Sequence, residues 1–294
     1  MRRIAIVGVG LLGSAVASRL LAGGFAVSGY DTRREALNAL EPRGLKAAAS
    51  VKDAVEGADA VFTILPSLDT VEAAIAGPGG IVANLARPGV VIQMSTISPT
   101  LTRRLAEATE AAGLGFLDTP MSGTSSMVER GDCTIFAGGD AALVEHCRPA
   151  FAAIGKRTIH VGPVGSASLA KLATNLLVAV NTAALAEALV LGAKGGLDPQ
   201  ALLDILKDSA GASKMVDVRG PLMVGHRFDP QMKVELFLKD FRLMLEEGQR
   251  LGVALPLTSL TQQICTATVA AGRGGEDLAA LITTLERMAG LGPE

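Results

Sequence analysis

Aromatic side chains are scarce in this chain of 294 residues, which has no tryptophan, one tyrosine and eight phenylalanines. Any ligand pocket must therefore be built from aliphatic walls, small residues and backbone amides. An excess of charge of either sign is also lacking, because 27 basic and 29 acidic residues give a formal net charge of −2. Without a basic surface field we expect no nucleic-acid partner.

Cysteines and long apolar runs are also few. Cys133, Cys147 and Cys265 lie far apart, and the histidines at 146, 160 and 226 are scattered, so we expect reduced thiols, no metal site and a cytoplasmic protein. No window holds about 18 uninterrupted apolar residues, so no membrane span is predicted. The N-terminal apolar run is soon interrupted by glycines, which favours a strand entering a turn over a signal peptide.

Short apolar segments alternate with segments of helical composition in the first part of the chain. Strands are predicted over residues 3–8, 25–30, 61–65, 90–94 and 115–118, with a helix over 11–22. Such alternation predicts a parallel, doubly wound α/β sheet. The length suggests two domains, and we place the first over residues 1–164.

From residue 165 onward the composition changes to long segments rich in alanine and leucine, with no convincing strand. Helices are predicted over residues 168–194, 199–207, 234–251, 256–271 and 276–289. We therefore expect an all-α second domain over residues 165–294.

A glycine-rich pattern, Gly8-Val-Gly-Leu-Leu-Gly13, follows the first predicted strand and opens a predicted helix, which is the context of a dinucleotide-binding fingerprint. A simple strand–helix turn is the plainer alternative. Asp31 ends the second predicted strand, 18 residues beyond Gly13, where a carboxylate would accept hydrogen bonds from a ribose hydroxyl. The candidate cofactor-binding residues are Gly8, Val9, Gly10, Leu11, Leu12, Gly13 and Asp31.

Asp31 also bears on the choice of cofactor, because its carboxylate would repel a 2′-phosphate and so favours NAD. Arg33 and Arg34 are close enough in sequence to reach such a phosphate, and NADP stays an alternative. Other candidates follow predicted strands at the edge where ligands bind in such sheets, although ordinary turn chemistry explains them as well. These are Leu65, Pro66, Ser95 and Thr96.

Lys171 and Asn175 lie four residues apart on a predicted apolar helix, so both polar groups share one face. An ammonium and a carboxamide on an apolar stretch suit the binding and protonation of a small oxyanion. A snorkelling lysine and a surface asparagine are the alternative. The surrounding motifs favour the catalytic interpretation.

Two further segments carry candidate substrate-binding residues. Ser122, with the amides of Gly123 and Thr124, suits a carboxylate, the alternative being an ordinary turn. Lys239 belongs to a charged pair on an otherwise apolar helix, where it is a candidate second cation for the substrate or cofactor, the alternative being a solvated helix face.

Together these motifs resemble the β-hydroxyacid dehydrogenases, a family that includes 3-hydroxyisobutyrate dehydrogenase, tartronate semialdehyde (2-hydroxy-3-oxopropionate) reductase and glyoxylate/succinic semialdehyde reductases. The resemblance spans nearly the whole chain. It implies an N-terminal Rossmann domain, a long interdomain helix over 165–194 and a helical C-terminal domain that often forms dimers or tetramers. The matching segments are Gly8–Gly13, Asp118–Gly123, the run from Gly162 through Lys171 to Asn175, and Lys239-Asp240.

By this resemblance Lys171 matches the catalytic lysine and Asn175, Ser122 and Gly123 match residues that bind or orient the substrate, while Lys239 matches a lysine lining the same cleft. The chain departs from the family where Thr174, Ala167 and Thr124 replace an asparagine and two glycines that are frequent there. These departures bear on the substrate and leave the lysine chemistry intact. Imine reductases share the scaffold but usually lack the lysine.

The expected reaction interconverts a small β-hydroxy acid and its semialdehyde. Hydride addition to an aldehyde leaves an alkoxide, which Lys171 would stabilise and protonate; in reverse, a lysine with a pKa lowered by burial would take the hydroxyl proton. The alternatives are a non-catalytic dinucleotide-binding module and an enzyme like 6-phosphogluconate dehydrogenase. The polar segment over residues 209–214 slightly favours tartronate semialdehyde, or a related hydroxy acid, over 3-hydroxyisobutyrate.

Overall fold

The computed structural model describes residues 1–291 and divides the chain into two compact units, Met1–Lys171 and Leu172–Glu294. The division falls inside one long helix, α9 (Ser166–Lys194), which begins just after the boundary that we predicted at residue 164. Each unit has its own set of elements, and each is described separately.

The first unit is built on a nine-stranded sheet with the order β3-β2-β1-β4-β5-β6-β8-β7 and with β9 beside β8. The order β3-β2-β1-β4-β5-β6 is that of a Rossmann fold, and every pair within it is parallel. The strands are β1 (Arg3–Val7), β2 (Ala26–Tyr30), β3 (Lys46–Ala47), β4 (Ala60–Thr63), β5 (Val90–Gln93), β6 (Gly115–Asp118), β7 (Met121–Ser122), β8 (Thr134–Gly138) and β9 (Arg157–Gly162).

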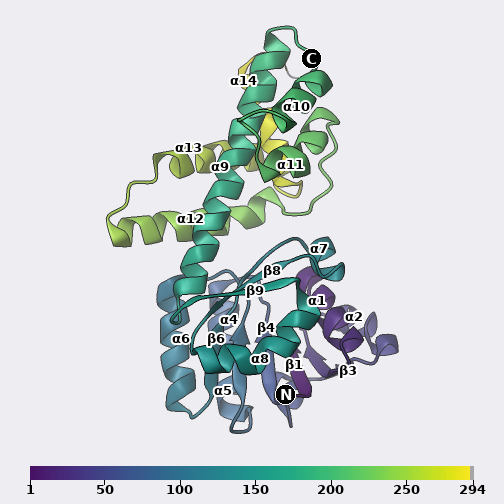
Figure 1. Cartoon of the computed structure of the whole chain (residues 1–294), viewed down its shortest axis with the longest axis vertical. Coiled ribbons are helices and arrows are strands. Elements are labelled where there is room, and N and C mark those ends of the chain that lie inside the picture. The colour runs from purple at the N-terminus through teal and green to yellow at the C-terminus, as the bar shows by residue number, and fades with distance from the viewer. Residues whose placement is uncertain (292–294) are drawn as a thin grey trace. The chain divides into compact units, whose positions relative to one another are not determined.

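Helices cover both faces of this sheet (Figure 1). Alternate side chains of β1 enter two cores, with Ile4 and Ile6 packing under α1 and α8, and Ala5 and Val7 packing under α4, α5 and α6. The central strands are buried on both faces, as parallel strands covered by helices must be. The helices are α1 (Leu11–Ala22), α2 (Arg34–Asn38), α3 (Val51–Val55), α4 (Leu68–Ala76), α5 (Ile81–Asn84), α6 (Pro99–Ala111), α7 (Ser125–Glu129) and α8 (Ala141–Ile154), with a 3₁₀ turn, η1 (Glu41–Arg43).

The predicted Rossmann architecture is confirmed, with corrections at its C-terminal edge. We predicted a parallel sheet, and the sheet is parallel except that β8 runs antiparallel to β6 and β7. We also missed β3, β7, β8 and β9, because two of them have only two residues and the others are not continuous apolar runs. The predicted strand at 61–65 ends earlier, at Thr63.

The second unit is helical over its described residues, apart from an isolated bridge between Lys233 and Asp277. Its core contains Phe237 and Phe241 of α12, whose rings meet edge to face with centroids 5.3 Å apart. The elements are the C-terminal part of α9, α10 (Pro199–Lys207), α11 (Lys214–Val224), α12 (Val234–Leu251), α13 (Pro256–Thr268), η2 (Val269–Arg273), η3 (Leu278–Leu281) and α14 (Ile282–Met288).

The predicted all-α composition is confirmed, but individual helices differ. The sequence analysis missed α11, whose residues lack a clear apolar stripe. The helix predicted over 256–271 is confirmed as α13 continued by the start of η2, and the helical backbone ends where Gly272 has a φ of 83°. The helix predicted over 276–289 consists of a 3₁₀ turn followed by α14.

Helix α9 is the helix in residues 1–291 with the length and composition of a membrane span, with a mean hydropathy of 1.9 in its most apolar window. About 44% of that window is buried in the protein. Its buried polar residues Ser168, Asn175 and Thr182 form hydrogen bonds within the protein. These are the features of a core helix.

Candidate active site

The glycine-rich turn lies where the strand order reverses, between β1 and β4, which is where dinucleotides bind in open α/β sheets. Gly8 follows β1 with a φ of 95°, and a Cβ there would lie 2.2 Å from the Ile64 carbonyl oxygen. A Cβ on Gly13 would lie 2.0 Å from the Gly8 carbonyl oxygen. Only glycine fits either position, as the fingerprint requires.

Gly10 is different, because a Cβ there would meet only the Arg33 side chain, whose Nη2 atom would be 3.3 Å away. Gly10 is the N-cap of α1 and provides no capping side chain. The amides of the first turn of α1 therefore suit a pyrophosphate. The residues present fit a dinucleotide.

Asp31 follows β2 and is joined to this turn. Its Oδ2 atom accepts a hydrogen bond from the Val9 amide at 2.8 Å, and its Oδ1 atom accepts one from the Arg33 amide at 2.9 Å. The Arg33 side chain also donates from Nε to Oδ1, at 3.4 Å, so Oδ2 is the oxygen that keeps a second lone pair for a ribose hydroxyl. The structure thus brings together two predicted features, the glycine turn and the acidic residue.

Leu65 and Ser95 are also brought together, at the carboxyl ends of β4 and β5. The Leu65 amide donates a hydrogen bond to Ser95 Oγ at 2.8 Å. Pro66 is exposed, and Thr96 is half-buried. The four residues predicted to bind the cofactor here therefore follow two adjacent strands at one edge of the sheet.

The segment from Ser122 to Thr124 makes a tight corner between β7 and α7. Gly123 has a φ of 150°, and a Cβ there would lie 2.9 Å from Cys133 Cβ. Thr124 is the N-cap of α7, with its hydroxyl accepting from the Met127 amide at 3.4 Å. Its side chain therefore has a local structural role, and Ser122 is half-buried beside it.

Asp118, which ends β6 and is fully buried, has a role that was not predicted from the sequence. Its Oδ2 atom accepts hydrogen bonds from the amides of Gly165, at 3.2 Å, and Ser168, at 2.8 Å, and its Oδ1 atom accepts one from Ser168 Oγ at 2.7 Å. Burial raises the pKa of this carboxyl to about 6, although the hydrogen bonds from Ser168, Gly165 and Ala167 act in the opposite direction. The partners lie 47 and 50 residues away, so no local signal reveals them.

Lys171 and Asn175 lie one turn apart on α9, as predicted. Asn175 is 5% exposed, and its Nδ2 atom donates to Asp240 Oδ2 at 2.8 Å. Because a carboxylate only accepts, this bond fixes the orientation of the carboxamide. Lys239 Nζ lies 2.8 Å from the other oxygen, Asp240 Oδ1.

Asp240 is therefore the residue that links two predicted ones, Asn175 and Lys239. The sequence showed it as part of a charged pair on a helix, and the plainer interpretation was a solvated face. Its side chain is only 6% exposed, so that interpretation is wrong for Asp240. A short charged pair inside an apolar helix was the signal that pointed to it.

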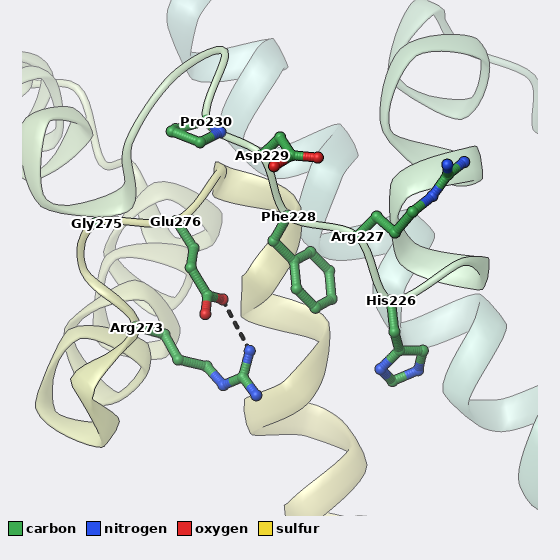
Figure 2. A pocket seen from close by; sticks show the side chains of 8 residues that line it. All are labelled: His226, Arg227, Phe228, Asp229, Pro230, Arg273, Gly275 and Glu276. Atoms are coloured by element: carbon green, nitrogen blue, oxygen red, sulfur yellow. Dashed lines mark hydrogen bonds and ion pairs between the residues drawn. The ribbon is translucent and has the colours of Figure 1, made fainter.

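A pocket of about 530 Å³ elsewhere in the second unit contains none of the predicted residues. Figure 2 shows it between the α11–α12 loop and the segment after η2. Of its lining residues, Arg273 forms an ion pair with Glu276 at 2.8 Å, and His226 Nε2 lies 3.1 Å from Glu286 Oε1. We assign no chemistry to it.

The possible metal ligands and the cysteines in the described part of the chain are placed as follows. Residues 1–291 contain no group of three or more His, Cys, Asp or Glu residues placed to hold a metal ion. The three cysteines are free and buried. Burial raises the pKa of Cys147 and of Cys265 to about 12, so these two thiols are poor nucleophiles at neutral pH.

Comparisons with known proteins agree with this geometry. Residues 3–162 match the model of the NAD binding domain of 6-phosphogluconate dehydrogenase, and residues 165–285 match the model for NAD-binding of NADP-dependent 3-hydroxyisobutyrate dehydrogenase. The 2-(hydroxymethyl)glutarate dehydrogenase of Eubacterium barkeri is 33% identical over 290 residues, which are 98% of this chain and 96% of that protein. The chain belongs to the β-hydroxyacid dehydrogenase family.

Other members show the range of the family. The 2-hydroxy-3-oxopropionate reductase of Escherichia coli (strain K12) is 30% identical over 287 residues, covering 98% of each chain. A solved structure of Mycobacterium tuberculosis 3-hydroxyisobutyrate dehydrogenase with L-serine has a TM-score of 0.89 at 29% identity, covering 97% of this chain and 99% of that one. The protein is thus an NAD(P)-dependent oxidoreductase of β-hydroxy acids.

The match to the 3-hydroxyisobutyrate dehydrogenase model over the second unit favours this family over the 6-phosphogluconate-dehydrogenase-like alternative. That alternative shares only the N-terminal description.

Proposed function

We propose that this β-hydroxyacid dehydrogenase reduces a small semialdehyde bearing a carboxylate, with Lys171 as the acid and base and Asn175 as the orienting group. The nicotinamide cofactor supplies or accepts the hydride when bound. The fixed carboxamide of Asn175 carries the proposal, because a directed amide beside a lysine has little use on a plain apolar helix.

Lys171 would stabilise the alkoxide that forms at the reacting carbon and protonate it. Asn175 directs its nitrogen to Asp240 at 2.8 Å, which leaves its oxygen turned to accept from a substrate hydroxyl. Both side chains come from helix α9, four residues apart in the sequence.

Ser122 and the amides of Gly123 and Thr124 would bind the substrate carboxylate. The corner depends on glycine, because Gly123 has a φ of 150° and a Cβ there would lie 2.9 Å from Cys133 Cβ. Because the Thr124 hydroxyl caps α7, we expect its contribution to come from its amide. Lys239 would provide the second cation near the carboxylate or the cofactor.

Residues 1–164 would bind the cofactor and residues 165–294 would complete the substrate site and the oligomer. Asp31, held beside the glycine turn, favours NAD, although Arg33 keeps NADP as an alternative. The cofactor-binding set is Gly8, Val9, Gly10, Leu11, Leu12, Gly13, Asp31, Leu65, Pro66, Ser95, Thr96 and Lys239.

The substrates named for the relatives differ in the group on C2, next to the carboxylate. Residues 209–214 supply polar side chains, and Ser213 and Lys214 stand at the start of α11. We propose that they favour a polar C2 group, as in tartronate semialdehyde, over the methyl group of 3-hydroxyisobutyrate.

We also propose a cytoplasmic homodimer or homotetramer without nucleic-acid or membrane partners. Large apolar side chains are exposed on the second unit, including Leu191 at 76%, Leu257 at 63% and Leu260 at 58%. Such side chains suit an interface between copies. Light scattering would show a monomeric mass if this were wrong.

The test is steady-state oxidation of NADH and of NADPH by the wild type and by Lys171→Ala. The substrates are tartronate semialdehyde, methylmalonate semialdehyde, succinic semialdehyde and glyoxylate. We expect turnover with at least one substrate, with NADH preferred, and a loss of several orders of magnitude in the variant while NADH still binds. Tight NADH binding without any turnover would instead favour a non-catalytic binding module.

A further inference from the structure

Helix α9 is anchored to the sheet by a buried carboxylate from another part of the first unit. Asp118 receives three hydrogen bonds from the start of α9 and the turn before it, donated by the Gly165 amide, the Ser168 amide and the Ser168 hydroxyl. Ser168 Oγ also lies 2.9 Å from Thr102 Oγ1 on α6. The first turn of α9 is thus held by two elements of the same unit.

The position of this carboxylate suits its charge. Amide groups at a helix N-terminus have no partner within the helix and carry partial positive charge. Asp118 satisfies the Ser168 amide as a capping residue would, but from a strand 50 residues earlier in the chain. Its distance in sequence makes it a clamp between strand and helix as well as a cap.

The anchored turn is directly next to Lys171. Ser168 precedes Lys171 by three residues, which is about 4.5 Å along a helix axis. If the first turn of α9 slipped or rotated, the Cα of Lys171 would therefore move about as far as the turn itself. The hydrogen bonds to Asp118 are the contacts that such a movement would break.

We propose that Asp118 is a positioning residue for the reaction: its carboxylate fixes the first turn of α9 and thereby sets where the Lys171 ammonium group stands. This inference rests on the role proposed for Lys171 above. It assigns a function to a residue that does not itself touch the substrate.

Stability alone is a poor explanation for this carboxylate. A charge without solvent contact is costly to bury, and this cost is what raises the pKa of the Asp118 carboxyl. The guanidinium group of Arg103, on α6, lies close to the same turn, since a Cβ on Gly165 would lie 2.7 Å from Arg103 Nη1. A neutral side chain could cap the helix; the charge adds strength to the three bonds that hold it.

The first test compares Asp118→Asn and Asp118→Ala with the wild type. Asparagine keeps the shape, with its oxygen accepting from the two amides and its nitrogen donating to Ser168 Oγ, so the charge is lost and the bond to the Ser168 hydroxyl reverses its direction. We expect kcat to fall about tenfold for Asn and about a hundredfold for Ala, as a displacement of about 1 Å would cause. KM and the Kd for NADH should change less than about threefold, because the glycine turn is untouched.

Thr109→Val is the matched control. Thr109 is a fully buried hydroxyl residue on α6 of the same unit, and it bonds only locally, to the Leu105 carbonyl at 2.7 Å. If this variant lowers kcat as much as Asp118→Asn, general loosening of the unit explains the effect and the proposal is wrong.

The decisive readout is a double-mutant cycle with Lys171→Ala. When the lysine ammonium is gone, its position no longer matters, so adding Asp118→Ala should change the residual kcat by less than about twofold. If Asp118 acted only on folding, or only through Ser122, Asp118→Ala would lower the residual kcat of Lys171→Ala by the same factor as it lowers kcat in the wild type.

The cycle also separates the two proposals. If Lys171→Ala keeps most of its activity, the proposed function and this inference both fail. If Lys171→Ala loses several orders of magnitude in kcat but the Asp118 effects are absent, or multiply with that loss, the function stands and the inference is overturned.

Discussion

Alanine at Gly13 should lower stability, whereas alanine at Gly10 should lower NADH affinity, although the two glycines belong to one motif. A Cβ at Gly13 would lie 2.0 Å from the Gly8 carbonyl oxygen and 3.0 Å from its carbon, and backbone atoms cannot move aside cheaply. Overpacking against backbone costs about 3 kcal/mol, and alanine regains about 1 kcal/mol through helix propensity. Gly13→Ala should therefore lower the free energy of unfolding by about 2 kcal/mol, or Tm by about 4–8 °C.

A Cβ at Gly10 would meet only the flexible end of Arg33, at 3.3 Å. The free energy of unfolding should then change by less than about 0.5 kcal/mol. NADH should bind about tenfold more weakly or worse, because the methyl group would stand where the backbone approaches the pyrophosphate.

Urea unfolding without cofactor and titration of NADH fluorescence measure the two effects separately, and the absence of tryptophan keeps the second signal clean. Equal destabilisation by both variants, or normal NADH binding by Gly10→Ala, would refute the reasoning.

Two further predictions concern buried carboxylates. Asp277 is 1% exposed and accepts from Arg219 Nε, at 3.1 Å, and from the amides of Gln231, Met232 and Ala279. Asp277→Ala should cost about 3–5 kcal/mol in urea unfolding, because it leaves the Arg219 charge buried without its partner; a cost below about 1 kcal/mol would contradict this. For Asp118, whose pKa is raised from 3.8 to about 6 by burial, the folded protein binds more protons than the unfolded chain between these values. This group therefore lowers stability as pH rises from about 4 to about 6, and Asp118→Asn should gain relative to wild type over that window, by at most about 3 kcal/mol. An unfolding free-energy difference independent of pH would show that the pKa is not raised.

The sequence predicted the parts of the fold that depend on local patterns. The strand at residues 3–7 and the glycine turn after it were readable, because apolar runs and glycines act on neighbouring residues. Strands β7 and β8 were not, since a two-residue strand and its antiparallel partner are defined by pairing with distant segments. Helix α11 was missed for a similar reason, because its stability comes from packing in the second unit.

The same division holds for the candidate site. The i, i+4 relation of Lys171 and Asn175 follows from helix geometry alone, and so could be predicted. The bond from Asn175 to Asp240 joins residues 65 apart, and those from Ser168 and Gly165 to Asp118 join residues 50 and 47 apart. Such partners are set by tertiary structure, and no spacing rule in a single sequence identifies them.

The central claim is that this chain transfers hydride directly to a semialdehyde, with Lys171 supplying the proton. The most direct measurement is single-turnover reduction of the best substrate by NADH carrying deuterium at C4, followed by mass spectrometry of the product. We predict one deuterium on the carbinol carbon of the hydroxy acid in the wild type, and its formation slowed by several orders of magnitude in Lys171→Ala. Product without deuterium from either C4 position, or an unchanged rate in the variant, would contradict the account.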